Sequence, residues 1–237
     1  MHPYLTEAFL LRSIPYGETD LVVTMITPTG GQIGCLARSA RKSAKRFGAP
    51  LDFFNLLHAE LKPAKSSMAK LMRVELLKTF ERPRRDMEAY FTAGHFLEII
   101  RLAGREGDSS PELFTLLKTG LEALEGGGEP KSLARVFQIR LISLLGYSLG
   151  GARCVECQVE FSTGASLVNE ALHCDDCAGQ GGERLSQGAV RTLAGALTVE
   201  FGKLRLPSAI EAELGPIVER ALTRALGKEP KSLSMGG

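Results

Sequence analysis

Four cysteines in the second half of the chain have the spacing of a metal site. They form two Cys-x2-Cys pairs with sixteen residues between them: Cys154 with Cys157, and Cys174 with Cys177. Each pair bends into a tight turn that places two sulfurs on one side, so two such turns supply four thiolates in a tetrahedron. This pattern is typical of a zinc ribbon or knuckle. The sequence therefore predicts one structural Zn²⁺ ion.

The same segment also allows a catalytic interpretation. Cys154, Glu156 and the second cysteine pair imitate the zinc deaminases, in which three ligands leave a position for water and a glutamate moves protons. Cys157 is placed to fill that position, and His173 stands where the deaminase signature has proline. A closed structural site is the stronger hypothesis, with His173 beside it as a bystander. A redox pair or four unliganded thiols would not explain why both pairs occur together.

A run of cations offers a different chemistry, the binding of a polyanion. Between residues 38 and 46 there are five cations and no anion, and Phe47 follows directly. On a loop, such a run tracks a phosphate backbone, and an aromatic neighbour can stack on a base. The predicted DNA-binding residues are Arg38, Arg41, Lys42, Lys45, Arg46 and Phe47. The alternative is a solvated loop with Phe47, Phe53 and Phe54 packed in the core.

The distribution of charge along the chain favours the same partner. The formal net charge is +2, but residues 1–85 hold 14 Lys and Arg against 7 Asp and Glu, and the remainder holds 15 against 20. A basic first part beside an acidic remainder suggests that the first part meets a polyanion. Arg82, Arg84 and Arg85, at the junction of the barrel and the helices, would extend this basic face or, equally, have a helix-capping or solvated role.

Composition and the start of the chain limit the class of protein. Hydrophobic residues make up 44% and charged residues 24%, which are ordinary globular values. There is no apolar run of about 18 residues that would span a bilayer, and no secretory signal is visible. We therefore expect a cytoplasmic protein without a membrane partner, in which thiols stay reduced. Cys35 lies in a strand pattern and is expected to be a small buried residue.

The elements that must position these residues fall into two groups. Five segments in the first 80 residues have strand patterns and turn signals, which predicts a small barrel: 6–13, 21–27, 32–37, 55–62 and 68–79. The last of them could equally be a short helix. The basic run then lies in the loop between the third and fourth strands.

The rest of the chain has helical periodicity. Apolar residues at helical spacing and capping signals predict helices over 87–103, from Pro111 to the glycines at 126–128, from Leu133 to Gly146, from a Ser186 cap through Phe201, and up to Leu226 with an interruption near Gly215-Pro216. The cysteine pairs lie between two of these helices. The predicted fold class is therefore α+β, a barrel followed by a helical domain with an inserted zinc module.

Several segments, in order along almost the whole chain, resemble the RecO family of bacterial recombination-repair proteins. They are Tyr16-Gly17-Glu18-Thr19-Asp20, the strand 21–27, Gly30, the basic run 38–46, the helix 137–145 with Gly146-Tyr147, the cysteine turn after it, and residues 226–232. One departure is Ser39, because the family usually has glycine at this place in the basic loop. Some family members also lack the four cysteines.

This resemblance implies an architecture and a function. The architecture is an N-terminal OB-fold over residues 1–80 and a helical domain over 81–237 with a zinc module inserted at 152–180. The function is binding of single- and double-stranded DNA, annealing of complementary strands, and help in loading RecA onto single strands coated with single-strand-binding protein. The implied partners are RecR and the acidic C-terminal tail of single-strand-binding protein, at the nucleoid. No catalytic residue is implied.

The family resemblance also places a pocket for the partner tail in the helical domain. Such a pocket needs an apolar floor and a cation for the terminal carboxylate. Arg135 and Arg140 with Phe137 are the candidates, against the alternative that both arginines are solvated edge residues of a core helix. For the whole protein, the competing hypothesis is a zinc-ribbon regulatory protein whose basic loop meets RNA or an acidic protein.

Overall fold

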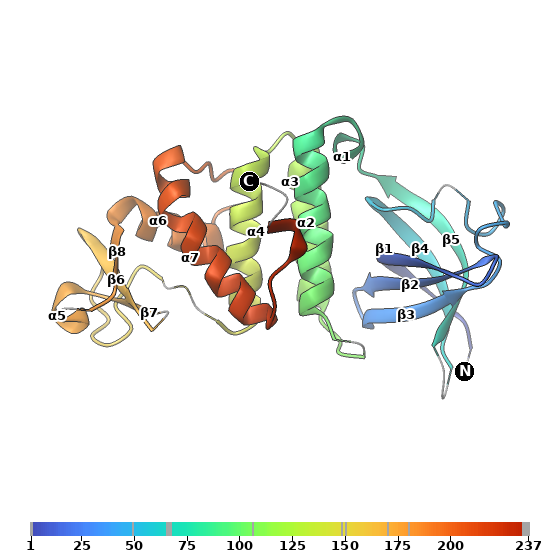
Figure 1. The fold of residues 1–237 in the computed structure, drawn as a ribbon, viewed down its shortest axis with the longest axis horizontal. Helices are drawn as coiled ribbons and strands as arrows, with labels where there is room; N and C mark the ends of the chain where they lie inside the picture. Colours follow the sequence, from blue (N-terminus) through green and yellow to red (C-terminus); the bar gives the residue numbers. More distant parts are fainter. Residues whose placement is uncertain are drawn as a thin grey trace. The chain divides into compact units, whose positions relative to one another are not determined.

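The protein was analysed as a computed structural model that describes residues 2–48, 50–64, 68–105, 107–147, 149, 151–169, 171–179 and 181–233. Its internal contacts divide the chain into two compact units, Met1–Glu125 and Gly126–Gly237. Figure 1 shows the strands of the barrel in the first and a mixture of helices and short strands in the second. The two units are described separately below.

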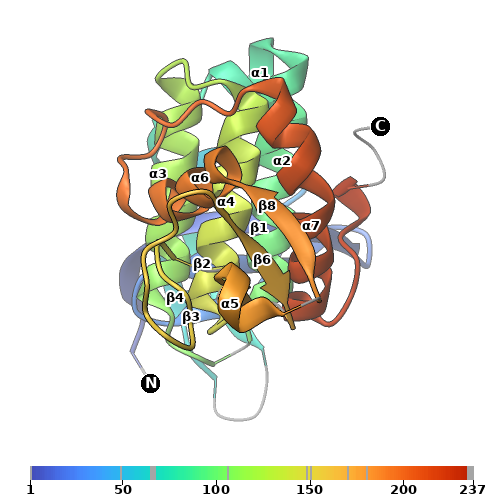
Figure 2. The ribbon, with the colours of Figure 1, turned by 90° about the vertical axis from the view of Figure 1, so that its left-hand side faces the viewer.

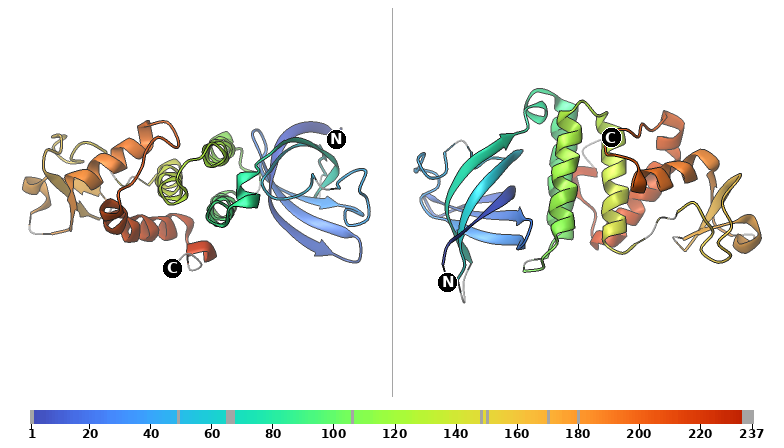
Figure 3. Two further views of the ribbon diagram at one scale, coloured as in Figure 1. Left: turned by 90° about the horizontal axis from the view of Figure 1, so that it is seen from above. Right: turned by 180° about the vertical axis from the view of Figure 1, so that it is seen from behind.

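The first unit contains a closed five-stranded barrel. Its strands are β1 (Tyr4–Tyr16), β2 (Asp20–Thr27), β3 (Gly31–Ala37), β4 (Asn55–Lys62) and β5 (Ala69–Thr79). They close in the order β1-β2-β3-β5-β4, with β3 and β5 parallel and the other pairs antiparallel, and the ring is visible in the left view of Figure 3. This confirms the predicted OB-fold barrel. The segment that begins at residue 68 forms a strand and not a helix.

Alternation of side chains fills the barrel. Because successive strand residues point to opposite faces, every second residue enters the interior. Cys35 is fully buried there, as its strand pattern predicted. The other fully or nearly fully buried members of this core are Ala8, Leu10, Val23, Met25, Ala37, Phe47, Leu57, Ala59, Leu61, Leu71 and Val74.

Three helices complete the first unit: α1 (Arg82–Arg85), α2 (Met87–Ala103) and α3 (Pro111–Glu125). They cover an outer face of the barrel, because the ring of Phe9 on β1 lies 5.4 Å from that of Phe114 on α3 and 6.1 Å from that of Phe80. The Asp86 side chain caps α2 by accepting from the backbone N–H groups of Glu88 and Ala89. The compact unit thus extends past residue 80, and a separate domain over 1–80 stays a prediction.

The second unit is built on three longer helices. They are α4 (Pro130–Leu144), α6 (Gln187–Thr198) and α7 (Ser208–Leu226), followed by a short 3-10 turn, η1 (Lys231–Leu233). The predicted interruption near Pro216 is wrong, since α7 runs through it. A proline inside a helix removes one backbone hydrogen bond. Burial of Leu214, Ile217 and Val218 on either side holds the segment in one helix despite that loss.

A small sheet lies between α4 and α6 in the sequence. It consists of β6 (Gly164–Val168), β7 (Ala171–His173) and β8 (Glu183–Ser186), in the order β7-β6-β8, with the one-turn helix α5 (Asp175–Ala178) after β7. Figure 2 shows β6 and β8 side by side. The sequence pattern did not predict these strands. They extend the cysteine segment to Ser186, whose side chain caps α6 by accepting from the Ala189 N–H.

Candidate nucleic-acid interface and metal centre

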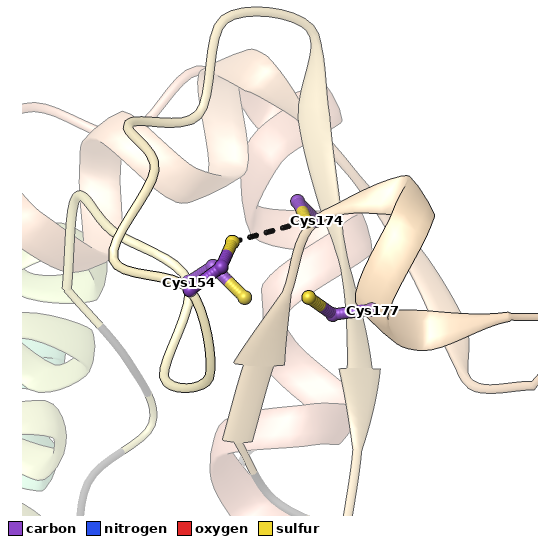
Figure 4. A group of neighbouring side chains, drawn as sticks. Cys154, Cys174 and Cys177 are labelled. Atoms are coloured by element: carbon purple, nitrogen blue, oxygen red, sulfur yellow. Dashed lines mark hydrogen bonds between the residues drawn. The ribbon is translucent and has the colours of Figure 1, made fainter.

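The four cysteines of the predicted metal site come together. Their sulfurs all lie within 4.8 Å of one another, and those of Cys157 and Cys174 are 3.6 Å apart; Figure 4 shows the side chains converging. A tetrahedral zinc site with Zn–S distances of about 2.3 Å requires sulfurs about 3.8 Å apart. The donor set and its dimensions therefore fit one four-coordinate metal ion.

Backbone hydrogen bonds set the two cysteine turns. In the first turn, the Cys154 N–H donates to the Val159 carbonyl at 2.9 Å, and the Gln158 N–H donates to the Cys154 carbonyl at 3.0 Å. In the second, Cys174 occupies the N-cap of α5. The Val155 N–H donates to the carbonyl of Leu172, at 3.1 Å, and so ties the first turn to β7. These backbone bonds bring the two cysteine pairs, which are sixteen residues apart in the sequence, close together.

The electrostatics of the cluster favour a cation. Burial opposes ionisation of the Cys154 thiol, but the backbone N–H groups of Cys157, Cys174 and Glu156 lower its pKa to about 6. Hydrogen bonding to the sulfurs of Cys174 and Cys157, together with burial, raises the pKa of Cys177 to about 12. The Cys154 thiol thus loses its proton readily, whereas loss of a further proton, from Cys177, is unfavourable. A divalent metal removes this obstacle, because it neutralises the charge that the thiolates accumulate.

The catalytic interpretation finds no support in the arrangement of the described residues. The cluster of potential ligands consists of the four cysteines, and His173 is not part of it. The His173 Nδ1 is buried without a hydrogen-bond partner among these residues. Cys157 takes the fourth corner, where a deaminase would hold water. Four sulfurs close the coordination sphere, which is the arrangement of a structural site.

The predicted basic run begins the long connection from β3 to β4. The side chains of Arg38, Arg41, Lys42 and Lys45 are exposed, and that of Arg46 is half-buried. For the side chains of Lys42 and Lys45, the described part of the chain provides no hydrogen bond or ion pair. Their ammonium groups are therefore available to a phosphate.

The backbone of this loop is fastened to the turn between β1 and β2. The Ser39 N–H donates to Asp20 Oδ1 at 2.7 Å, the Arg41 N–H to the Thr19 carbonyl at 3.0 Å, and Arg41 Nη1 to the Glu18 carbonyl at 3.2 Å. The hydrogen bond from Ser39, followed by that from the Thr19 hydroxyl, lowers the pKa of Asp20. Asp20 was not among the residues predicted to shape the loop, although it lies in the segment Tyr16–Asp20 that carried the family resemblance.

Two members of the predicted site have a different position from the one expected. Phe47 is 2% exposed and packs in the barrel core, so its ring offers no free face to a base. Arg46 lies over that ring at 5.0 Å from its centroid and donates to the Arg38 carbonyl at 2.9 Å. Phe47 therefore packs in the core, as the alternative interpretation stated, because the loop folds back over the barrel. Arg46 holds the loop in shape through its bond to the Arg38 carbonyl.

Comparison with known proteins identifies both parts of the chain. The family description "Recombination protein O N terminal" matches residues 1–80, and "Recombination protein O C terminal" matches residues 84–234. A DNA repair protein RecO of Geobacter sulfurreducens is 35% identical over 99% of this chain and 97% of its own length. The chain belongs to the RecO family. A RecO of Pelobacter propionicus is 32% identical over 98% of this chain and 96% of its own length.

Membership of the RecO family gives the chain a role in DNA repair and recombination, as its sequence resemblance predicted. The glycine that the family usually has in the basic loop corresponds to Ser39, which has φ +54°. This left-handed conformation favours glycine. The loop therefore keeps the glycine-type backbone even with serine in place, held by the bond from Ser39 to Asp20.

The RecO resemblance also suggested a tail pocket at Arg135, Phe137 and Arg140, and the structure gives all three residues internal partners. Arg135 is 7% exposed. Its guanidinium donates to Glu211 at 2.5 Å, to Glu219 and the Gly215 carbonyl at 3.1 Å, and to Gln138 at 2.8 Å. It thus joins α4 to α7, and it is neither free for a tail carboxylate nor a solvated edge residue.

Arg140 is half-buried and, like the buried Phe137, packs against Phe201. The Arg140 guanidinium lies 4.4 Å from the centroid of the Phe201 ring and donates to the carbonyls of Ala196, at 2.7 Å, and Val199. Phe137 is fully buried, with its ring 6.2 Å from that of Phe201. The sequence did not indicate these contacts, because Arg135 and Arg140 donate to carboxylates and carbonyls that are distant in the chain.

The arginines that follow the barrel are also engaged. Arg82 donates to the Leu124 carbonyl at 2.7 Å, and Arg84 donates to Asp52 at 2.9 Å and to the Phe53 carbonyl. Arg85 pairs with Glu81 at 3.3 Å but keeps 77% of its side chain exposed. Arg82 therefore joins α1 to the last turn of α3, in keeping with the helix-capping alternative, and Arg84 joins α1 to the loop before β4. None of the helices in the described ranges is long and apolar enough to cross a membrane.

Proposed function

We propose that this protein is a non-enzymatic DNA-binding mediator of recombination. In this proposal it binds single- and double-stranded DNA, anneals complementary strands, and assists loading of RecA onto DNA coated with single-strand-binding protein. Family membership across both halves of the chain carries the proposal. The exposed cations of the barrel loop support it, because a RecO protein needs a surface that accepts phosphates from any sequence.

The loop cations have separable roles in this proposal. Arg41 and Arg46 donate to backbone carbonyls and keep the loop in shape. Lys42 and Lys45, with Arg38, meet phosphates. A basic loop held rigidly at one end of a barrel can follow a backbone without ordering itself on binding, which spares the entropic cost of fixing it.

The metal in this proposal is one structural zinc ion held by Cys154, Cys157, Cys174 and Cys177. Four thiolates at these separations suit Zn²⁺. The ion would supply no reaction, because four protein ligands complete its shell. It would instead hold the cysteine turns against β7 and α5, where few apolar residues are available to do so.

The partners proposed from family membership are RecR and the C-terminal tail of single-strand-binding protein, with RecA affected indirectly. The proposed location is the cytoplasm, at the nucleoid. Arg135 and Phe137 have internal contacts, so the tail-binding surface is not assigned to α4 in this proposal.

The test compares ligands at several salt concentrations. Purified metal-loaded protein is titrated with a single strand, the matching duplex and an RNA of the same sequence, and annealing of complementary strands is followed by fluorescence. We expect salt-dependent binding to both DNA forms and faster annealing. Binding of RNA or an acidic protein, without DNA binding or annealing, would overturn the proposal in favour of a zinc-ribbon regulatory protein. Conversion of a base would indicate a deaminase.

A further inference from the structure

The outer surface of β1 near the basic loop carries an exposed aromatic side chain. Tyr16 is 60% exposed and Ile14, two residues earlier on the same strand face, is 39% exposed. Arg12 continues this row and is exposed as well. The register pairs Ile14 with Val22 and Val22 with Leu36, and both partners are half-buried. The row therefore forms a shallow apolar floor with Tyr16 at one end.

Hydrogen bonds fix Tyr16 beside the basic loop. Tyr16 is the strand partner of Asp20, whose carboxylate accepts from the Ser39 N–H at 2.7 Å. The turn after Tyr16 accepts two further bonds from Arg41, at the carbonyls of Thr19 and Glu18. The turn and the start of the loop thus form one assembly within the first unit, so the backbone at Tyr16 lies beside the backbone of the basic loop.

The charge around Tyr16 suits a polyanion more than an apolar protein partner. Arg38 and Arg41 are exposed beside the turn that follows Tyr16, because Arg41 donates to the Glu18 carbonyl and Arg38 directly precedes Ser39. Arg12 is exposed further along the same strand face. Two carboxylates are nearby. That of Asp20 is occupied by Ser39 and Thr19, and that of Glu18 lies at the exposed tip of the turn. Cations with an aromatic side chain between them are the elements of a site for single-stranded nucleic acid.

We propose that Tyr16 stacks on an unpaired base of single-stranded DNA whose phosphates meet the basic loop. This inference rests on the proposed function and assigns a residue to one part of it. Phe47 cannot perform this task because it is buried. A base inside a duplex is already stacked, so Tyr16 would act on single strands and not on duplex DNA. Stacking by Tyr16 would therefore favour unpaired single strands, which are the form of DNA that annealing requires.

The first test measures Tyr16→Ala. Loss of one stacking contact is expected to weaken single-strand binding about 5- to 100-fold, while duplex affinity changes less than about twofold. The salt slope should stay the same because no phosphate contact is lost. Tyr16→Phe keeps the ring and should bind as the wild type does. Tyr147→Ala removes a tyrosine that is 42% exposed in the other unit and serves as the matched control.

A strand without bases sharpens the test. On an abasic oligonucleotide of the same length, wild type and Tyr16→Ala should bind equally, because only the backbone remains. The chain contains no tryptophan, so Tyr16→Trp introduces a single tryptophan, whose emission can be excited apart from that of the tyrosines. Its emission should be quenched by single-stranded DNA and unchanged by the abasic strand. Circular dichroism of each variant checks that the fold is retained.

The outcomes separate this inference from the proposed function. If wild-type protein binds no DNA, the proposed function fails. If wild type binds DNA but Tyr16→Ala binds single strands equally well, or loses duplex and abasic binding to the same degree, the stacking role of Tyr16 is overturned and the proposed function stands. A Tyr16→Trp emission that does not respond to single-stranded DNA would also overturn it.

Discussion

The basic loop of the first unit and the two charged clusters of the second unit use charge in opposite ways. In the loop, Lys42 and Lys45 point into solvent without a described counter-charge. In the second unit, Arg135 forms ion pairs with Glu211 and Glu219, and the sulfurs of the four cysteines lie within 4.8 Å of one another. The loop leaves its charge uncompensated, whereas Arg135 is compensated internally and the thiolates of the cysteine cluster would be compensated by a metal ion.

This difference separates binding from stability. An exposed cation is solvated by water and contributes little to folding, so its charge is available to a partner. A buried charge must find its opposite within the protein, and removal of one member leaves the other unpaired at a large cost. Changes in the clusters should therefore affect folding of the second unit, and removal of the exposed loop lysines should affect the proposed DNA binding with little effect on folding.

The largest effect expected on the cluster side is loss of the metal. Cys154→Ala removes a fully buried ligand, and structural zinc contributes on the order of 10 kcal/mol to folding of small modules. We expect the bound metal to be lost and the segment from Ala152 to Ser186 to become sensitive to protease. Elemental analysis and limited proteolysis measure the two effects.

The fifth cysteine provides the control for this prediction. Cys35→Ala changes an equally buried thiol of the barrel and should cost about 1 kcal/mol with one metal ion per chain retained. Equal metal content in the two variants, or an absence of metal from freshly purified reduced wild type, would contradict the structural site.

The second effect concerns the buried arginine. Arg135→Ala leaves Glu211, Gln138 and the Gly215 carbonyl without their donor. Breaking a buried pair costs about 3–5 kcal/mol, and we expect the lower end, about 3 kcal/mol, because Glu219 is partly solvated. Urea unfolding measures the change. Arg191→Ala, an exposed arginine on α6, should stay within about 0.5 kcal/mol of wild type.

This measurement also decides between the two roles considered for Arg135. If Arg135→Ala unfolds at the same urea concentration as wild type but loses affinity for an acidic tail peptide, then the α4–α7 cluster is a binding site after all. Arg135 would then contribute to binding and not to stability, as the loop lysines are proposed to do.

The third effect belongs to the loop. In the double variant Lys42→Ala/Lys45→Ala, two phosphate contacts are removed, so the log–log salt slope for single strands should become shallower by about 1.4. The free energy of unfolding should stay within about 0.5 kcal/mol of wild type. Fluorescence anisotropy across a series of salt concentrations measures the slope. Lys131→Ala/Lys228→Ala makes the same change of net charge in the second unit and should leave the slope unchanged.

Local pattern was sufficient to predict the barrel. The strand predicted over 55–62 coincides with β4, because alternation and flanking turn residues are properties of neighbouring residues. The first strand was predicted to stop before Pro15, yet β1 continues to Tyr16. Pro15 lies next to the hairpin turn, where a missing donor is tolerated. The cysteine spacing likewise predicted the four-sulfur cluster, since two such pairs rarely have another use.

Contacts between distant residues could not be predicted in the same way. Arg135 meets Glu211 and Glu219, 76 and 84 residues further along the chain, and nothing in the helix around Arg135 signals this. Phe47 was predicted to stack on a base because it directly follows the cations, with core packing as the alternative, and its buried position depends on how the loop folds back. The strands β6 to β8 are three to five residues long, too short for a periodic pattern to emerge.

The smallest expected effect tests whether the loop is held in advance of DNA binding. Ser39 has φ +54°, a conformation that costs a residue with a Cβ about 1–2 kcal/mol. Glycine relieves this cost but loses about 0.5–1 kcal/mol through the greater freedom of the unfolded chain. Because the relief outweighs the loss, Ser39→Gly should stabilise the protein by about 0.5 kcal/mol in urea unfolding, with the salt slope unchanged. Ala44→Gly, in the same loop but without a left-handed backbone, should instead destabilise by about 0.5–1 kcal/mol. If both substitutions destabilise equally, the bond from Ser39 to Asp20 does not fix the left-handed turn, and the loop takes its shape only when DNA is bound.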